Sequence, residues 1–200
     1  MRVIGIDEVG RGAWAGPLTV GAAELTSDFA GLADSKRLSA SRRETLAEQL
    51  RHAGARLGLG WVSPAEIDRL GLTAAMELAI KRSLIGFDVD DAHIIIDGHL
   101  DYLGWQNSEA IIDADDSHPV VSAASIVAKV ARDNLMKKLH LRFDGYGFDR
   151  NVGYGTSLHR SGLEQFGHTR IHRLSFKPVQ KYVTTSINYQ HWSTGRERRR

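Results

Sequence analysis

Residues 3–12 read Val-Ile-Gly-Ile-Asp-Glu-Val-Gly-Arg-Gly. The run at residues 3–7 is short and apolar and ends in an acid, which predicts a buried strand. Gly10 and Gly12 flank Arg11 directly afterwards and predict a loop whose backbone can approach a ligand closely. In open α/β sheets, ligands bind outside the carboxyl ends of strands, so this edge of the predicted sheet is a candidate site.

The rest of the chain alternates strand-like and helix-like segments. In the segment 55–61, leucines alternate with Arg56, Gly58 and Gly60, which predicts a strand buried on one face only. Residues 144–154 are rich in glycine and aromatic residues and are predicted to be irregular. The whole pattern predicts an α/β fold, a mixed sheet flanked by helices. Further strands are predicted at residues 18–25, 55–61, 93–97 and 110–113, and helices at residues 39–53, 63–71, 72–84, 120–142 and 157–166.

The composition is that of a globular protein without cysteine chemistry. The chain has 200 residues, of which 42% are hydrophobic and 25% charged, which suits one domain with a sizeable core. Cysteine is absent, so disulfides, thiolate metal sites and a cysteine nucleophile are excluded. Asp7 and Glu8 interrupt the apolar core that a signal peptide needs, and no window offers about 18 uncharged apolar residues. We therefore expect a cytoplasmic protein that does not cross a membrane.

Basic charge is concentrated at the C-terminus. The net charge is +2, and residues 196–200 contribute +3, so residues 1–195 carry −1. We predict one folded domain at residues 1–180 and a basic tail at residues 181–200. A basic tail attracts polyanions such as nucleic acid, and the alternative is a solvated end without a partner.

Carboxylates follow several of the predicted strands. Acids that gather at one sheet edge repel one another unless a cation neutralises them. Oxygen ligands without cysteine select a hard cation such as Mg²⁺ or Mn²⁺, and two such ions about 4 Å apart are a common device for phosphodiester cleavage. The alternative is that these acids are solvated strand ends. Asp7 and Glu8 alternate across a regular strand, so we expect them to share a site only if the backbone is irregular there. The other acids are Asp97 and the group Asp113, Asp115 and Asp116.

Basic, hydroxyl and aromatic residues supply candidate contacts to nucleic acid. Arg11 can fork onto a phosphate, and Tyr154, between two glycines, can stack on a sugar or base. The alternatives are an ordinary turn, a solvated helix face and a tyrosine that packs over its own loop. His159, His168 and His172 have no motif that links them to the acids, so we predict structural roles for them. Candidate phosphate contacts are Ser35, Lys36, Arg37, Ser122, Ser125, Lys129 and Arg132.

Taken in order, several segments resemble ribonuclease HII, the type 2 ribonuclease H family. The resemblance runs in register from about residue 3 to 180, and the combination of its first and fifth segments is highly specific. The segments are residues 5–12 (GIDEVGRG), 15–17 (AGP), 34–39 (DSKRLS), 96–98 (IDG), 122–133 (SAASIVAKVARD), 146–148 (YGF), 153–156 (GYGT) and 171–179 (IHRLSFKPV).

The resemblance implies a ribonuclease-H-like catalytic domain with a small helical C-terminal part. It also implies cleavage of the RNA strand of RNA–DNA hybrids and incision 5′ to a ribonucleotide embedded in duplex DNA. The products would carry a 3′-hydroxyl and a 5′-phosphate. We expect a monomer that acts in ribonucleotide excision repair and DNA replication.

The resemblance also implies residue roles. Two Mg²⁺ or Mn²⁺ ions would be held by Asp7, Glu8, Asp97 and Asp115. Asp113 and Asp115 share a face if their segment is extended, and the family's spacing before Ser122 favours Asp115. The 2′-hydroxyl would be sensed by the backbone of Gly10, Arg11 and Gly12, the junction sugar checked by Tyr154, and phosphates contacted by Lys36, Ser125 and Lys129.

Three positions depart from the family pattern. Trp14 replaces a smaller aliphatic residue, Asn151-Val152 replaces His-Lys, and Leu174 replaces an arginine. These changes bear on affinity for phosphates and leave the predicted metal site intact.

Two other functions are compatible with parts of the pattern. One is a hybrid nuclease that needs a run of ribonucleotides. The other is a non-catalytic nucleic-acid-binding module that uses Arg11, the basic helix residues and the tail. Such a module has no need for acids at three strand ends, since they repel phosphate.

Overall fold

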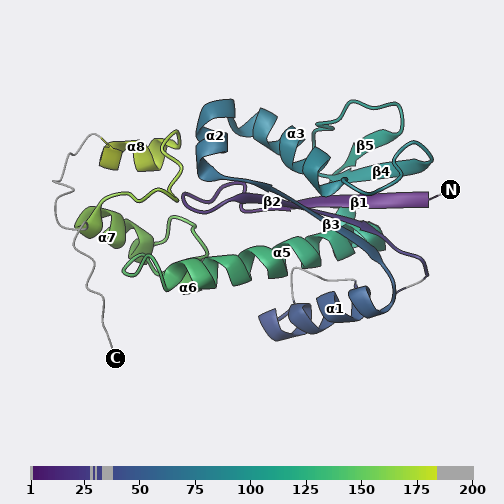
Figure 1. Cartoon of the computed structure of the whole chain (residues 1–200), viewed down its shortest axis with the longest axis horizontal. Helices are drawn as coiled ribbons and strands as arrows, with labels where there is room; N and C mark the ends of the chain where they lie inside the picture. The colour runs from purple at the N-terminus through teal and green to yellow at the C-terminus, as the bar shows by residue number, and fades with distance from the viewer. Residues whose placement is uncertain (1, 28, 30, 33–37, 184–200) are drawn as a thin grey trace.

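The fold is known from a computed structural model, which describes residues 2–27, 29, 31–32 and 38–183 (Figure 1). Its centre is a five-stranded mixed sheet in the order β3-β2-β1-β4-β5. β1 runs antiparallel to β2 and parallel to β4, and β4 runs parallel to β5. The predicted α/β class is therefore confirmed. The strands are β1 (Arg2–Val9), β2 (Leu18–Glu24), β3 (Arg56–Val62), β4 (Ala92–Asp97) and β5 (Ser108–Ile111).

The central strand β1 is longer than its apolar run predicts. It continues to Val9, because Asp7, Glu8 and Val9 pair with Gly21, Val20 and Thr19 of β2. The two acids therefore lie inside the strand rather than after it, which corrects the expected end at residue 7. The pairing with β2 is regular there, yet both acids line the same cleft, so the prediction that they share a site only if the backbone is irregular was wrong.

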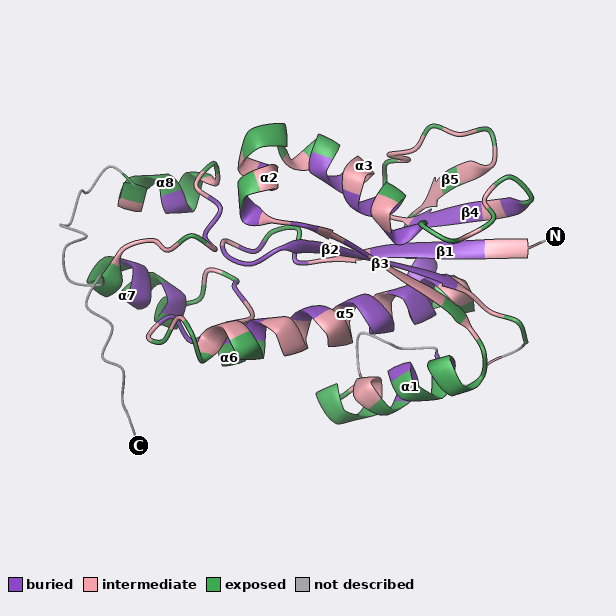
Figure 2. Ribbon diagram, viewed as in Figure 1, coloured by how far each residue is buried: buried purple, intermediate pink, exposed green. Residues whose placement is uncertain are grey.

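Helices cover both faces of the sheet. One face packs against α2 (Pro64–Leu70) and α3 (Leu72–Ser83) through a core that contains Ile4 and Ile6 of β1. The other face packs against α5 (Pro119–His140), which in turn packs against α1 (Ala40–His52). Figure 2 shows β2 and the middle of β1 buried between these layers, while the ends of β1 are partly exposed.

The glycine face of β3 is not open to solvent as predicted. A Cβ added at Gly58 or Gly60 would collide with backbone atoms of α3, so α3 lies directly on that face. On the other face, Leu57 and Leu59 pack against the core shared by α1 and α5. Both faces of β3 are therefore covered, because glycine lets the helix backbone approach the strand closely.

The long helix α5 packs against β1 and β2 as closely as α3 packs against β3. A Cβ added at Gly5 would collide with the backbone of Val120, and one at Gly21 with that of Ala124. This close approach fixes the position of the following turns of α5 along β1. It brings the polar side chains of Ser125 and Lys129 over the end of β1.

The segment after β5 also differs from the prediction. β5 ends at Ile111, and Asp113 then adopts a left-handed backbone with φ 53°. The helix α4 (Ala114–Ser117) follows, so the strand predicted at residues 110–113 is present but lies two residues earlier, and Asp113 and Asp115 do not share a strand face. This turn redirects the chain before α5 begins.

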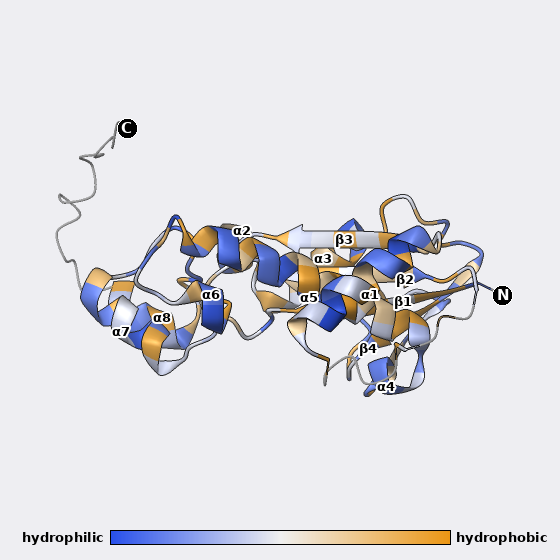
Figure 3. Ribbon diagram, turned by 90° about the horizontal axis from the view of Figure 1, so that it is seen from below, coloured by the Kyte–Doolittle hydropathy of each residue, from blue (hydrophilic) through white to orange (hydrophobic). Residues whose placement is uncertain are grey.

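The C-terminal helices gather at the end of the molecule away from the N-terminus, as Figure 3 shows. The stretch 144–154 contains one short helix, α6 (Phe148–Asn151), and is otherwise irregular as predicted. After α7 (Ser157–Phe166), α8 (Lys177–Val183) spans the predicted boundary at residue 180. The rest of the predicted tail lies outside the described residues. In the described part of the chain, no helix combines the length and the apolar character needed to cross a bilayer.

Candidate active site

A cleft of about 370 Å³ opens at the carboxyl end of β1. It is bordered by the central strand, the end of β4, and the sides of α1 and α5. Acidic and basic side chains face each other across it, which is the arrangement expected for a site that binds a phosphate diester. The lining residues are Asp7, Glu8, Val9, Arg43, Asp97, Ser125, Ile126 and Lys129.

Asp7 is the most deeply buried acid of the cleft, with 8% of its surface exposed. Its Oδ1 accepts a hydrogen bond from the Glu8 backbone N–H at 2.7 Å. The pKa of Asp7 is raised to about 7, mainly by burial and also by the charges of Glu8 and Asp97, while a hydrogen bond from Ser125 opposes the shift. The ionised carboxylate is therefore costly here unless a cation neutralises it.

Glu8 lines the same cleft although it points to the other side of the strand. Both acids border the cleft because it lies at the strand's end. Burial raises the pKa of Glu8, Arg11 lowers it and Asp97 raises it. Arg11 Nη1 lies 3.7 Å from Glu8 Oε1, so this arginine of the loop is directed at an acid of the cleft.

Asp97 ends β4, as predicted, and β4 pairs in parallel with β1. Its Oδ1 accepts a hydrogen bond from the backbone N–H of Ala114 at 2.8 Å, which connects β4 to α4. Asp115, which follows Ala114 in α4, is 2% exposed, whereas Asp113 and Asp116 are exposed. Three of the four predicted ligands thus line one cleft, and the fourth is buried in the helix that is bound to Asp97.

These acids do not yet form a closed metal site. Among the residues that the structure describes, no group of three or more His, Asp or Glu side chains is set to hold an ion. The donor set nevertheless fits a hard cation, because the acids are oxygen ligands and their burial and mutual repulsion disfavour the ionised state.

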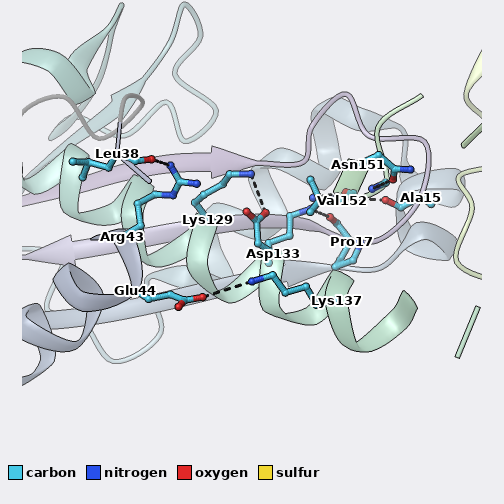
Figure 4. Close-up of polar contacts among 12 residues, drawn as sticks. Ala15, Pro17, Leu38, Arg43, Glu44, Lys129, Asp133, Lys137, Asn151 and Val152 are labelled. Carbon is cyan, nitrogen blue, oxygen red and sulfur yellow. Dashed lines mark hydrogen bonds and ion pairs between the residues drawn. The ribbon is translucent and has the colours of Figure 1, made fainter. Parts of the chain in front are cut away.

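Basic side chains form the rim of the cleft on α1 and α5 (Figure 4). Lys129 pairs with Asp133 at 2.9 Å. Arg43 was missed by the sequence interpretation, since nothing in the pattern of α1 distinguishes it from its exposed neighbours. One of its guanidinium nitrogens donates to the Leu38 carbonyl. Lys36 lies outside the described residues.

The two elements predicted to contact the sugar, the loop at residues 10–12 and Tyr154, lie next to one another; we call them the sugar-reading elements. Gly10 has φ 80°, which glycine adopts without strain and which turns the chain directly after β1. A Cβ on Gly12 would lie 4.0 Å from Cε1 of Tyr154. Tyr154 is 38% exposed. The loop at residues 10–12 and Tyr154 therefore present one continuous surface, although they are separated by more than 140 positions in the sequence.

Two of the departures from the family pattern, Asn151 and Trp14, have structural explanations. Asn151 is buried, and its side chain donates to the Tyr146 carbonyl at 2.7 Å and accepts from Gly153 N–H at 2.9 Å. It therefore shapes the turn before Tyr154. Trp14 packs closely on Gly155, and the Leu174 N–H donates to Asp68 at 2.9 Å.

Arg132 is not a phosphate contact. It is fully buried, and its guanidinium donates to backbone carbonyls inside the protein. Helical spacing from Lys129 suggested an exposed basic face, but the segment that packs over this end of α5 covers Arg132.

The family model for ribonuclease HII matches residues 4–179. The chain belongs to the ribonuclease HII family. The ribonuclease HII of Streptomyces avermitilis is 46% identical over 178 residues, which cover 87% of this chain and 76% of the relative. That of Jannaschia sp. is 44% identical over 184 residues, which cover 90% and 92%. The resemblance found in the sequence is therefore confirmed.

Solved structures agree with this assignment. The ribonuclease HII of Archaeoglobus fulgidus, solved in complex with PCNA, is similar with a TM-score of 0.76 and 26% identity, covering 88% of this chain and 96% of that one. Ribonuclease H2 from Pyrococcus horikoshii OT3 gives 0.75 and 27%, covering 91% and 97%. This member of the ribonuclease HII family is thus a ribonuclease H, an endoribonuclease that acts on RNA–DNA substrates, and it has the ribonuclease-H-like fold.

Proposed function

We propose that this ribonuclease HII cuts the RNA strand of RNA–DNA hybrids and also incises duplex DNA 5′ to a single embedded ribonucleotide. The products carry a 3′-hydroxyl and a 5′-phosphate. The observation that carries the proposal is the cleft in which Asp7, Glu8 and Asp97 face the basic side chains of Arg43 and Lys129. The acids suit cations and the bases suit phosphate oxygens, so one cleft supplies both halves of a phosphodiester site.

Two divalent cations, Mg²⁺ or Mn²⁺, complete the proposed site. Asp7, Glu8, Asp97 and Asp115 would hold them. When bound, such ions neutralise phosphate charge and lower the pKa of water. The raised pKa of Asp7 supports this assignment, because a cation in the cleft favours the ionised carboxylates that burial disfavours. All four acids belong to one chain, which supports action as a monomer.

Protein side chains bind the phosphates, position Asp7 and contact the sugar. Lys129 and Arg43 hold the backbone phosphates on the open side of the cleft. Ser125 donates to Asp7 and holds that carboxylate in place. The Gly10–Gly12 loop and Tyr154 lie against the sugar that precedes the DNA. Selectivity then depends on duplex shape and on the 2′-hydroxyl rather than on base edges.

A set of three end-labelled duplexes tests the proposal. One contains a single ribonucleotide, one contains a run of ribonucleotides, and one is DNA only. Each is incubated with the full chain in Mg²⁺, in Mn²⁺ and in EDTA. We expect cleavage of the first two duplexes with either metal, a cut 5′ to the single ribonucleotide, and no cleavage in EDTA or of DNA alone.

The other outcomes identify the alternatives. Cleavage of the run but not of the single ribonucleotide would indicate a hybrid nuclease of narrower activity. Binding without cleavage at every metal concentration would indicate a binding module. The variant Asp113→Asn is a matched control, because it removes an exposed acid from the same segment as Asp115 and should leave all three results unchanged.

A further inference from the structure

Arg173 is a fully buried arginine whose hydrogen bonds end on the loop that follows β1. Its Nη2 donates to the Gly10 carbonyl at 2.7 Å and its Nη1 to the Arg11 carbonyl at 2.8 Å. Its Nε donates to the Gly16 carbonyl at 3.1 Å. One side chain from the segment between α7 and α8 therefore fixes three carbonyls of residues 10–16.

Arg132 does the same from α5. It too is fully buried, and it donates to the carbonyls of Pro17 at 2.9 Å, Val152 at 2.8 Å and Ala15 at 3.2 Å. A Cβ on Gly10 would collide with its guanidinium, so the loop rests directly on this side chain. Together the two arginines bind five backbone carbonyls of residues 10–17.

Arg132 also contacts the second sugar-reading element. Its guanidinium carbon lies 5.8 Å from the centre of the Tyr154 ring, and its Val152 bond holds the turn that precedes Tyr154. The backbone adds a direct connection, since the N–H groups of Trp14 and Ala15 donate to the Gly153 carbonyl. The loop and the tyrosine are thus parts of one hydrogen-bonded unit.

We propose that Arg132 and Arg173 are positioning residues that hold residues 10–17 and Tyr154 in a single fixed arrangement, and that this arrangement sets the preference for a ribonucleotide next to DNA. The inference rests on the proposed function. Neither arginine touches the substrate, because both are covered by the loop that they hold.

The chemistry of the guanidinium explains why arginine is used here. Burial lowers the pKa of both side chains, and with a pKa of about 9 Arg173 remains cationic at neutral pH. Burying a cation is costly, and it is tolerated where several strong acceptors satisfy it. Arginine offers a planar fork of donors that reaches three carbonyls at once, whereas lysine is a compact point charge.

The test uses Arg173→Lys and Arg132→Lys, which keep the charge and lose the fork. Arg82→Lys is the matched control, because Arg82 joins α3 to the Trp61 carbonyl and to Glu66 at a distance from the cleft. Amide hydrogen exchange of residues 10–17 is measured first. It is compared with kcat/KM for a duplex containing a single ribonucleotide and for one containing a run.

We expect exchange in the loop to become about tenfold faster or more in both test variants and to stay unchanged in the control. The value of kcat/KM for the single-ribonucleotide duplex, divided by that for the duplex with a run, should fall about tenfold. Cleavage at a single ribonucleotide depends most on the fixed loop. Unchanged loop exchange, or equal losses on both substrates, would overturn the proposal, since a residue that only stabilises the fold lowers both rates together.

Two further outcomes are decisive. If the lysine variants do not fold, exchange in the wild-type protein decides: the hydrogen-bonded amides of residues 13–16 must exchange as slowly as those of β1, and fast exchange overturns the proposal. If the wild-type protein does not cut at a single ribonucleotide, the proposed function fails, and hydrogen exchange in the variants still reports separately on the fixed loop.

Discussion

Nε2 of His159 lies 3.0 Å from Nε2 of His172 inside the C-terminal part of the molecule. His172 Nδ1 accepts from the Thr169 backbone N–H at 2.9 Å, so its proton belongs on Nε2 and is donated to His159. His159 Nδ1 then donates to the Tyr154 carbonyl at 3.0 Å. Two neutral imidazoles thus connect the Thr169 turn to the loop of Tyr154, in agreement with the structural role predicted for them.

This pair makes stability depend on pH. Burial lowers the pKa of His159, and it lowers that of His172 from 6.5 to about 3. Between these pH values the unfolded chain binds more protons than the native one, so stability is complete above about pH 6.5 and falls as the pH drops toward 3. In urea unfolding, wild type should lose about 1–2 kcal/mol more than His172→Gln between about pH 7.5 and 5. Parallel losses would contradict this role, and His52→Gln, at an exposed position, controls for the loss of a histidine.

Asp7→Asn should stabilise the metal-free protein at alkaline pH. Because the pKa of Asp7 is raised from 3.8 to about 7, the native state holds its proton more tightly, and ionisation lowers stability as the pH rises through this range. In EDTA at about pH 8, we expect the variant to be more stable by at least about 1 kcal/mol, with a smaller difference at about pH 5. A difference that does not change with pH would show that Asp7 is not strained by burial. Asp113→Asn provides the exposed control.

Asp115 should be the fourth essential acid. It is buried beside the residue that binds Asp97, whereas Asp113 and Asp116 are exposed. Across a Mg²⁺ titration, Asp115→Asn should lose most of its cleavage activity, and the two neighbouring Asn variants should stay within a few-fold of wild type. A larger loss in Asp116→Asn than in Asp115→Asn would show that the register is wrong by one residue.

Lys129 should contribute to binding through charge. Lys129→Ala should weaken binding of a duplex and flatten the slope of log K against log salt concentration by up to about 0.9, the value for one phosphate contact on B-form DNA. Lys137→Ala is the control, because Lys137 lies two turns further along α5 and pairs with Glu44. Equal slopes for wild type and Lys129→Ala would exclude the contact.

The sequence predicted the elements whose bounds depend on hydrophobic periodicity and capping residues within the segment itself. The long helix at residues 120–142 and the cap that begins at Ser63 are found nearly where predicted. The end of β1 was not, because the ladder to β2 extends a strand through acids that look like a terminus. The glycine face of β3 was misread for a related reason: whether a glycine faces solvent or a helix backbone depends on a partner elsewhere in the chain.

The site was predictable where strand order brings acids together. Apolar runs that end in acids singled out Asp7 and Asp97, and these residues lie near the carboxyl ends of the neighbouring parallel strands β1 and β4. The left-handed backbone conformation of Asp113 could not be predicted, since nothing in the neighbouring residues indicates that this residue adopts a positive φ. Burial also separates chemically equal residues: Lys129 and Arg132 lie one turn apart on α5, yet one lines the cleft and the other is enclosed.

The claim that the buried carboxylate cluster is the catalytic centre is tested most directly by the single-turnover rate at which Asp7→Asn cleaves a duplex containing one ribonucleotide in saturating Mg²⁺. The side chain keeps its shape and loses its charge, so binding of the duplex and the circular dichroism spectrum should be preserved. We expect a rate below about a tenth of the wild-type value, because an amide cannot supply the charge that a divalent cation requires. A rate above that value, with the variant correctly folded, would contradict it.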